Sequence, residues 1–379
     1  MRIVIAPDKF KGSLDAPAVA AAIADGVRRA FPQADIDLCP IADGGDGTMA
    51  ALVAATGGRL EHCRVVGPLP DMRVDASFGW LGDGKTAVVE MAAASGLALL
   101  KPDERDPMAT TTFGTGQLMM TAARAGAANI ILGIGGSATI DGGIGCCQAC
   151  DLPVILRDGE PLSPSEPLCG RDLDRVVLIK HGRGSPVERT RITVACDVRN
   201  PLFGEQGAAV MYGPQKGATP GQVRWFDDQL RALAERTGKL HEAAQPGAGA
   251  AGGLGFAMLA YFPNATLRPG VEIVFNAVDL RRRLIGADLC ITGEGRFDVS
   301  SLHGKAPHAV AEVCRELGVP CVAAVGSFEP RAAALAGNLF RNMYAVQKEG
   351  VRFEEALARA EPLLRQIGEH LIIPRGPVL

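Results

Sequence analysis

A glycine-rich turn directly after an apolar strand is the feature that most constrains this chain. Residues 129–132 are apolar and rich in β-branched side chains, a pattern that predicts a buried strand. Five of the next eleven residues, 133–143, are glycine, and a small-residue helix is predicted over 144–150. Such a strand, turn and helix N-terminus directs backbone N–H groups at a phosphate. A tight turn with Asp141 as the helix cap is the alternative that this stretch leaves open.

The size and composition of the chain indicate a soluble protein of two domains. Its 379 residues exceed the usual size of one core, and 47% of them are hydrophobic while 21% are charged. The net charge of −3 provides no basic surface for nucleic acid or an anionic membrane, and no apolar run is long enough to span a bilayer. The ten cysteines lack the spacing of a disulfide scaffold, and the N-terminal residues resemble a strand rather than a signal peptide. We therefore expect reduced thiols and a cytoplasmic protein.

The order of predicted elements indicates an α/β fold with a discontinuous first domain. Strands and helices alternate at both ends of the chain, as in a parallel sheet, whereas short strand-like runs suggest hairpins between 59 and 91. We expect a Rossmann-like parallel-sheet domain of residues 1–60 and 265–379, with a second α/β domain of mixed sheet, 61–264, inserted into it. Further strands are predicted at 2–6, 35–39, 191–196, 287–292, 320–325 and 342–346. Helices are predicted at 15–31, 48–55, 115–125, 222–240, 306–317 and 353–373, and residues 153–187 are expected to be irregular.

Two nucleotide-binding patterns occur in the sequence, and neither has the required context. Residues 79–86 match the P-loop pattern, but strand-like residues lie on both sides where a helix should begin at Lys85. A hairpin with its turn at 82–84 is expected there instead. Residues 247–252 match the dinucleotide pattern, but Gln245 and Pro246 precede them in place of a strand. These glycines indicate a close backbone approach at a helix start better than they indicate a nicotinamide enzyme.

Polar residues gather after five predicted strands, where the ligands of open α/β sheets bind. The clusters are Asp8, Lys9 and Lys11; Asp43 and Asp46; Ser137 to Asp141; Asp197 and Asn200; and Glu294, Arg296, Asp298, Ser301 and Lys305. Caps, turns or solvated charges would explain one cluster but explain five poorly. The inventory suits phosphoryl transfer, which needs donors for phosphate, lysines for developing charge, carboxylates for Mg²⁺ and a carboxylate that orients an attacking hydroxyl.

Seven segments together resemble the type-1 glycerate kinase family, and the match runs in order over nearly the whole chain. They are residues 6–14, 41–48, 133–143, 196–202, 213–218, 246–253 and 292–296. The resemblance implies a two-domain α/β protein that phosphorylates glycerate with ATP and Mg²⁺, in glyoxylate, aldarate or serine-related carbon metabolism. It favours D-glycerate as the acceptor, with 2-phosphoglycerate and ADP as products. A 3-phosphoglycerate product, or a catalytically weakened paralogue that binds an organic acid, is the alternative.

Three positions depart from the family pattern. The family usually has Asn at the position of Ile140, often Ser at that of Lys9, and usually Gln at that of Ser300. An apolar Ile140 removes a hydrogen-bonding side chain from the central turn, which bears on substrate preference or rate. We expect Ile140 to face solvent or ligand, so that Ile140→Asn is tolerated.

The expected residue roles combine this resemblance with the chemistry of phosphoryl transfer. Asp298 is the expected base that accepts the hydroxyl proton, with Lys305 as its electrostatic partner and Asp197 as the rival base. The expected ligands of Mg²⁺ are Asp43, Asp46 and Asp197. The residues expected to bind glycerate or ATP are Lys9, Lys11, Gly135, Gly136, Ser137, Thr139, Asp141, Asn200, Lys216, Glu294 and Arg296. An ion pair with Glu294 is the alternative role of Arg296, and the chain is predicted to be a monomer or a homodimer.

Overall fold

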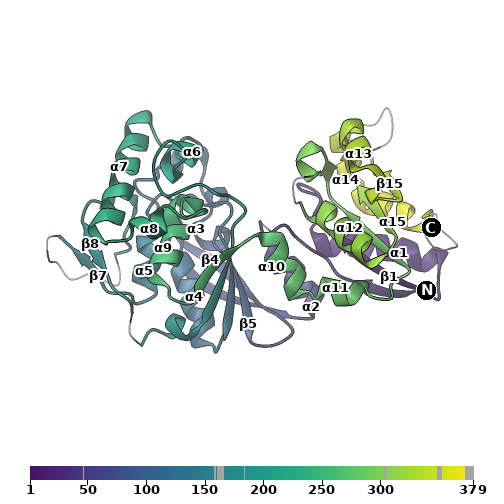
Figure 1. Cartoon of the computed structure of the whole chain (residues 1–379), viewed down its shortest axis with the longest axis horizontal. Helices are drawn as coiled ribbons and strands as arrows, with labels where there is room; N and C mark the ends of the chain where they lie inside the picture. The colour runs from purple at the N-terminus through teal and green to yellow at the C-terminus, as the bar shows by residue number, and fades with distance from the viewer. Residues whose placement is uncertain are drawn as a thin grey trace. The chain divides into compact units, whose positions relative to one another are not determined.

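The computed structural model describes residues 1–45, 47–157, 159, 166–182, 184–302, 305–347 and 352–371, which form two compact units (Figure 1). Unit 1 comprises Met1–Asp43, Ala50–Gly58 and Val271–Leu379, and unit 2 comprises Gly44–Met49 and Arg59–Gly270. The domain boundaries expected after residues 60 and 264 stay a prediction, because the compact units change at 58/59 and 270/271. None of the described helices combines the length and the apolar character needed to cross a membrane.

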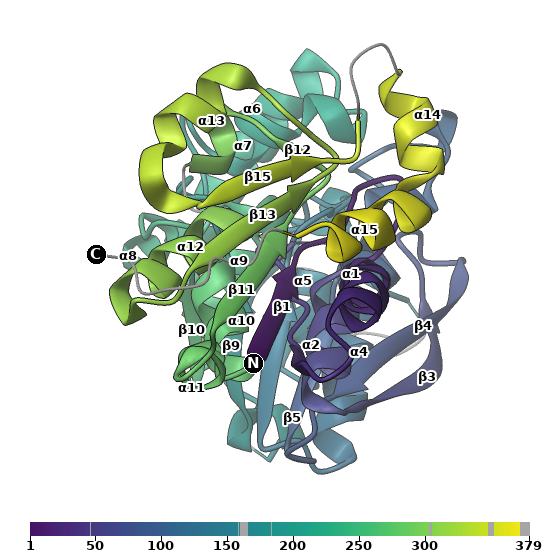
Figure 2. The ribbon, with the colours of Figure 1, turned by 90° about the vertical axis from the view of Figure 1, so that its right-hand side faces the viewer.

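Unit 1 contains a parallel sheet of five strands. The strands are β1 (Arg2–Pro7), β2 (Asp35–Leu38), β11 (Leu289–Gly293), β13 (Cys321–Val325) and β15 (Asn342–Ala345). They are ordered β15-β13-β11-β1-β2, and Figure 2 shows the first four of them side by side. The pairing of β1 with β11 therefore brings the start of the chain beside its last third.

Helices cover both faces of this sheet. The helices of this part are α1 (Ala16–Ala30), α2 (Thr48–Thr56), α10 (Gly270–Ala277), α11 (Leu280–Leu284), α12 (Ala306–Leu317), α13 (Pro330–Ala336), α14 (Phe353–Ala358) and α15 (Ala360–Glu369). α1 and α15 share a buried core with alternate strand residues such as Ile5 and Ile291, and α12 packs against β1, β11 and β13. A Cβ on Gly26 of α1 would lie 1.9 Å from the Arg365 carbonyl oxygen. A glycine is therefore required where α1 and α15 meet.

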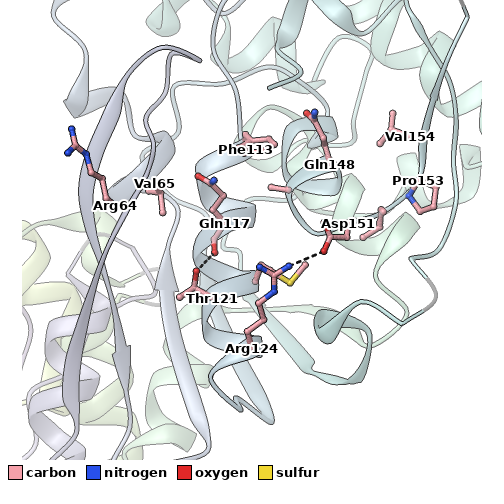
Figure 3. A pocket seen from close by; sticks show the side chains of 13 residues that line it. Arg64, Val65, Phe113, Gln117, Thr121, Arg124, Gln148, Asp151, Pro153 and Val154 are labelled. Carbon is pink, nitrogen blue, oxygen red and sulfur yellow. Dashed lines mark hydrogen bonds and ion pairs between the residues drawn. The ribbon is translucent and has the colours of Figure 1, made fainter. Parts of the chain in front are cut away.

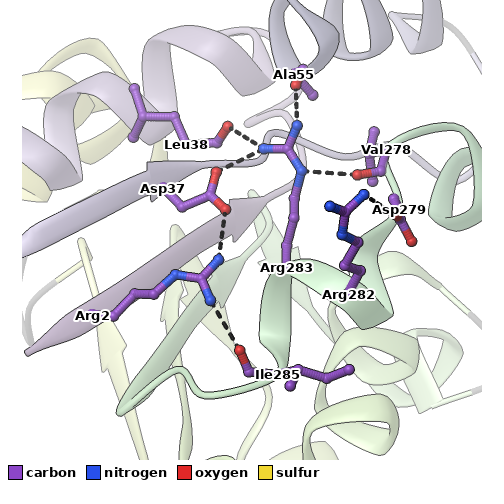
Figure 4. A network of polar contacts seen from close by, with 9 residues as sticks. All are labelled: Arg2, Asp37, Leu38, Ala55, Val278, Asp279, Arg282, Arg283 and Ile285. Carbon is purple, nitrogen blue, oxygen red and sulfur yellow. Dashed lines mark hydrogen bonds and ion pairs between the residues drawn. The ribbon is translucent and has the colours of Figure 1, made fainter.

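A half-buried arginine ties α11 to the edge of the sheet (Figure 4). Arg283 Nη1 donates to Asp37 Oδ1 at 2.7 Å, and its Nε donates to the Val278 carbonyl at 2.8 Å. The same guanidinium also donates to the Ala55 carbonyl, while Arg2 lies 3.4 Å from the other Asp37 oxygen. The planar five-donor fork of arginine can satisfy this many acceptors at once, which lysine cannot.

Unit 2 contains a six-stranded mixed sheet. Its strands are β3 (Arg59–Val66), β4 (Arg73–Trp80), β5 (Thr86–Glu90), β6 (Asn129–Gly133), β9 (Arg191–Ala195) and β10 (Ala265–Arg268). They are ordered β10-β9-β6-β5-β4-β3; the first four strands run parallel, and β4 pairs antiparallel with both β5 and β3. The main helices are α3 (Ala92–Ser95), α4 (Phe113–Arg124), α5 (Ile144–Ala149), α6 (Ala208–Tyr212), α7 (Pro220–Arg236), α8 (Leu240–Ala243) and α9 (Leu254–Tyr261). The predicted α/β class with a parallel and a mixed sheet is confirmed, and so is the hairpin at 82–84.

Three parts of the chain differ from the sequence prediction. The stretch 153–187 contains an antiparallel pair, β7 (Val154–Leu156) and β8 (Val176–Ile179), and β10 was not predicted. The helix predicted over 353–373 is divided into α14 and α15 at Arg359, whose φ of −112° is not helical. Pro362 explains this break, because its ring clashes with the carbonyl four residues earlier. The short strands are set by long-range pairing, which a local pattern does not record.

Candidate functional site

The acidic residues of unit 1 lie where β1 and β11 end. Because these strands pair in parallel, Asp8 and Glu294 leave the sheet at neighbouring positions. The Asp8 N–H donates to the Gly293 carbonyl at 2.8 Å, and the Lys9 N–H donates to Asp8 Oδ1 at 2.6 Å. A Cβ on Gly293 would lie 1.8 Å from the Ala324 carbonyl oxygen of β13. The glycine that precedes Glu294 therefore permits the close approach of two strand ends.

Burial gives both carboxyl groups unusual acidities. Asp8 and Glu294 are each 7% exposed. Burial and then the charge of Asp43 raise the pKa of Asp8 to about 7. Burial also raises the pKa of Glu294 to about 7, against a hydrogen bond from Ser301 and the charge of Lys305. Glu294 Oε1 is buried without a hydrogen-bond partner, so this group has both the pKa and a free oxygen for proton transfer near neutral pH.

Asp298 lies in the loop after β12 (Arg296–Phe297), and its carboxylate accepts hydrogen bonds from within that loop. Its Oδ1 accepts hydrogen bonds from the Ser300 N–H at 2.9 Å and from the Ser300 hydroxyl, while Lys305 Nζ lies 3.8 Å away. The Ser300 hydroxyl and the Lys305 charge hold the pKa of Asp298 below its usual range. A carboxylate held in its charged form is a weaker proton acceptor than one with a raised pKa.

The other predicted residues of unit 1 lie around these acids with different exposures. Lys9 and Asp43 are half-buried, whereas Lys11 and Arg296 are exposed. The charge of Arg296 contributes to the lowered pKa of Asp298. Asp46 lies outside the described residues.

In unit 2, a second glycine-rich segment, residues 247–252, packs against the glycine-rich loop between β6 and α5. A Cβ on Gly252 would lie 1.9 Å from the Thr139 carbonyl oxygen, and Gly252 has a φ of 67°. The Gly142 N–H donates to the Gly252 carbonyl at 3.0 Å. This geometry confirms the close backbone approach predicted for residues 247–252.

The buried carboxylate of Asp141 accepts hydrogen bonds that hold this loop in place. Its Oδ2 accepts hydrogen bonds from the Thr112 N–H at 2.8 Å and the Thr112 hydroxyl at 2.7 Å, and its Oδ1 accepts one from the Gly143 N–H at 3.0 Å. The side chain is fully buried, and burial raises the pKa of Asp141 although these hydrogen bonds oppose the rise. Asp141 therefore supports a tight turn, but it is not the helix cap that the alternative expected, because the N-cap residue of α5 is Gly143.

Ile140 corrects one expectation, because it faces neither solvent nor a ligand. Its side chain is 0% exposed and belongs to the hydrophobic core of unit 2 with Ile144 and Leu230. Ile140→Asn would bury an amide among apolar groups and is not expected to be tolerated.

Lys216 hydrogen-bonds to the glycine-rich loop and also lines a cavity of about 360 Å³ in unit 2. The cavity is lined by residues that include Gly135, Gly136, Ser137, Asp197, Tyr212 and Lys216. Lys216 is 2% exposed, and its Nζ donates to Ser137 Oγ and to the Thr139 carbonyl, each at 2.7 Å. Burial lowers the pKa of Lys216 to about 7, while the charge of Asp141 opposes that change. An ammonium has three donors, so one remains for an anion in the cavity.

Of Asp197 and Asn200, which follow β9, only Asp197 lines this cavity. Asp197 is exposed at its edge and accepts the Gly270 N–H at 2.9 Å. Asn200 accepts a hydrogen bond from the Tyr212 hydroxyl at 2.7 Å and donates to the Gln206 carbonyl at 2.8 Å. Asn200 thereby positions Tyr212, which lines the cavity.

A second cavity of about 550 Å³ in unit 2 contains none of the predicted site residues (Figure 3). Several of its polar side chains already have partners within the protein. Arg124 lies 3.2 Å from Asp151, and the Gln117 side chain accepts the Val66 N–H at 2.8 Å. We therefore take the cavity of about 360 Å³, which predicted site residues line, as the candidate binding site of unit 2.

Sequence reasoning gave no specific role to three residues that the structure places at these sites. Asp8 and Tyr212 lie beside predicted residues, and Thr112 supports Asp141. Asp8 could have been found, because it follows the strand that a parallel sheet would place beside the strand before Glu294. The partnership of Thr112 with Asp141 spans 29 positions and has no local signal.

The fold and these clusters define an α/β protein of two units, each with titratable groups at the carboxyl ends of parallel strands. A model of the glycerate kinase family matches residues 3–373. The chain is 43% identical to a glycerate kinase of Halalkalibacterium halodurans, over 98% of this chain and 97% of that protein. It is 46% identical to a glycerate 2-kinase of Escherichia coli, over 86% of this chain and 85% of the relative. A crystal structure of a candidate glycerate kinase 2 from Salmonella typhimurium is 41% identical with a TM-score of 0.86, covering 97% and 96% of the two chains. The chain belongs to the glycerate kinase family.

Proposed function

We propose that the protein transfers the γ-phosphoryl group of ATP to the 2-hydroxyl of D-glycerate, giving 2-phosphoglycerate and ADP. Family membership supports a kinase acting on glycerate, and the name of the Escherichia coli relative favours the 2-hydroxyl. The observation that carries the chemistry is the pair of buried carboxyl groups, Asp8 and Glu294, at the ends of β1 and β11.

We assign proton acceptance to Glu294, with Asp298 as the rival. Glu294 has a buried, unpartnered oxygen, whereas the Asp298 carboxylate is engaged by Ser300 and faces Lys305. In the proposed step the glycerate hydroxyl oxygen bonds to the γ-phosphorus, its proton passes to the Glu294 carboxylate, and the bond from that phosphorus to the leaving ADP oxygen breaks. Lys305, close to both acids, stabilises the negative charge on the phosphoryl group.

We assign phosphate binding to the cavity of unit 2. Gly135 and Gly136 present backbone without side chains there, and Lys216 offers its remaining N–H donor. The volume of about 360 Å³ lies within the range of small-molecule sites, roughly 300–1,000 Å³. An anion in this cavity would favour the charged form of Lys216, whose pKa burial lowers.

The donor set fits Mg²⁺ as the cation that the kinase would use. The charge of Asp43 raises the pKa of the nearby Asp8, and a cation bound beside these carboxylates would relieve that repulsion. We propose Asp43 and Asp197 as ligands, with Asp46 remaining a prediction outside the described residues. Mg²⁺ is commonly held by one or two carboxylates together with waters and substrate phosphates, and it would supply charge neutralisation for the transferred group.

A product-resolved kinase assay tests the proposal. ADP release from ATP and D-glycerate is followed by a coupled assay, and phosphorus NMR of the product distinguishes 2- from 3-phosphoglycerate. We expect ADP release that depends on both glycerate and Mg²⁺, with the 2-phosphate as the product. Glycerate binding by calorimetry without ADP release would instead support a non-catalytic binding protein.

A further inference from the structure

Three cysteines from distant parts of unit 1 bring their sulfur atoms together between the sheet and α12. Cys290 of β11 and Cys321 of β13 are paired in register, so their side chains point to the same face of the sheet. Cys314 lies on α12, which packs on that face. The three sulfur atoms all lie within 4.8 Å of one another, and the residues are 0–3% exposed. Among the described residues, this is the only group of three or more potential metal ligands that meets this distance.

The charge balance of the site decides which ligand fits. Three thiolates around a monovalent cation would leave two negative charges in an apolar interior, and around a divalent cation one. Such charges are costly to bury. A trivalent centre with three thiolates is neutral, and it needs no fourth ligand.

We propose that Cys290, Cys314 and Cys321 form a binding site for a trivalent, three-coordinate thiophilic centre of the arsenic(III) class. Arsenous acid exchanges its three hydroxyl groups for the three sulfurs: three arsenic–sulfur bonds form, three arsenic–oxygen bonds break, and three waters leave with the thiol protons. No electron is transferred, so no oxidant or reductant is required. The bound centre joins β11, β13 and α12.

Binding is expected to stabilise unit 1 and to be slow. A ligand that binds only the folded state raises the melting temperature, and the stabilisation grows with the logarithm of the ligand concentration divided by its dissociation constant. Because the sulfurs are buried, α12 must open before arsenic enters, so loading requires long incubation. This inference concerns binding alone and does not depend on the proposed kinase activity.

The experiment measures arsenite binding by the full-length, reduced protein. After incubation and gel filtration, we expect one arsenic per chain, three sulfur neighbours by X-ray absorption spectroscopy, and a higher melting temperature. Cys314→Ala and Cys321→Ala should each weaken binding at least a hundredfold. Cys146→Ala is the matched control, because Cys146 is also fully buried, near two other cysteines along α5, but lies outside the three-sulfur group.

The outcome can overturn the proposal without depending on the stability of the variants. Wild-type binding that Cys314→Ala leaves unchanged, or an absorption spectrum with only two sulfur neighbours, would show that the three residues do not act together. If Cys314→Ala fails to fold, alkylation of the wild type during slow exchange replaces it. Arsenite should then protect the peptides carrying Cys290, Cys314 and Cys321, and protection confined to other cysteines would refute the site.

Discussion

Replacing Glu294 by Gln should stabilise unit 1 at high pH and much less at low pH. Glutamine resembles the protonated acid in shape and charge, so it removes only the cost of burying the ionised carboxylate. Glu294 is 7% exposed, and burial raises its pKa from 4.5 to about 7. Between these two values the unfolded chain releases the proton while the folded chain keeps it. Wild-type stability therefore falls as the pH rises through this window and levels off above about 7.

The size of the effect follows from the shift. One pKa unit corresponds to about 1.4 kcal/mol, so the shift of Glu294 corresponds to roughly 3 kcal/mol of folding free energy. We expect the difference in unfolding free energy between Glu294→Gln and the wild type to grow by about this amount from pH 4.5 to pH 8. The gain in stability should accompany a loss in turnover of about a hundredfold or more, the usual contribution of a general base.

Urea unfolding at several pH values measures this difference for each unit separately. Far-ultraviolet circular dichroism reports both units, whereas Trp80 and Trp225, the two tryptophans of the chain, both lie in unit 2. The fluorescence transition should therefore stay unchanged in Glu294→Gln and serve as an internal reference. The transition of unit 1 should move to higher urea at pH 8.

Asp298→Asn is the matched control for the same loop. The pKa of Asp298 is lowered by Ser300 and Lys305, so its contribution to stability is present above its unfolded pKa and is lost only at acid pH. Its substitution should leave the pH slope of unit 1 between 4.5 and 8 unchanged. A parallel pair of stability curves for wild type and Glu294→Gln would refute the raised pKa. Near-normal turnover in Glu294→Gln, with a large loss in Asp298→Asn, would return the base to Asp298.

Three further predictions concern unit 2. Ile140→Asn should lower the unfolding free energy of unit 2 by about 3–5 kcal/mol, from a lost apolar side chain and a buried amide. Ile155→Asn, at an exposed position of the same unit, should lower it much less, and urea unfolding measures both. Gly252→Ala should destabilise by several kcal/mol more than Gly238→Ala in the same assay, because both glycines have positive φ but only Gly252 has a carbonyl within 1.9 Å of the added Cβ; equal losses would show that the contact is unimportant. The ATP affinity of the wild type, measured by calorimetry, should fall about tenfold between pH 6 and pH 8, because Lys216 loses its charge through a pKa of about 7. This fall is counted beyond any change that a Lys216→Met variant shows over the same range. Identical pH profiles for the two proteins would remove Lys216 from the phosphate site.

Local pattern determined much of the architecture from the sequence. The helix at 306–317 agrees with α12 at both ends, and the strand at 129–132 is one residue shorter than β6. The rejection of the P-loop at 79–86 was also correct, because the strand pattern on both sides describes the hairpin of β4 and β5. These features depend on side-chain periodicity and turn residues that are adjacent in the chain. The ordered family segments added the enzyme class, which no single motif supplied.

Tertiary contacts decided the chemistry of the individual residues. Ile140 is a core residue because apolar side chains from distant parts of the chain cover it. Lys216 is buried because it hydrogen-bonds to Ser137 and Thr139, which lie at least 77 residues earlier in the chain. The acidities of Asp8 and Glu294 depend on burial at the ends of two strands that are far apart in sequence. The sulfur atoms of unit 1 likewise meet only through strand register and helix packing. Burial and long-range neighbours set pKa values and contacts, and neither is encoded in a local pattern.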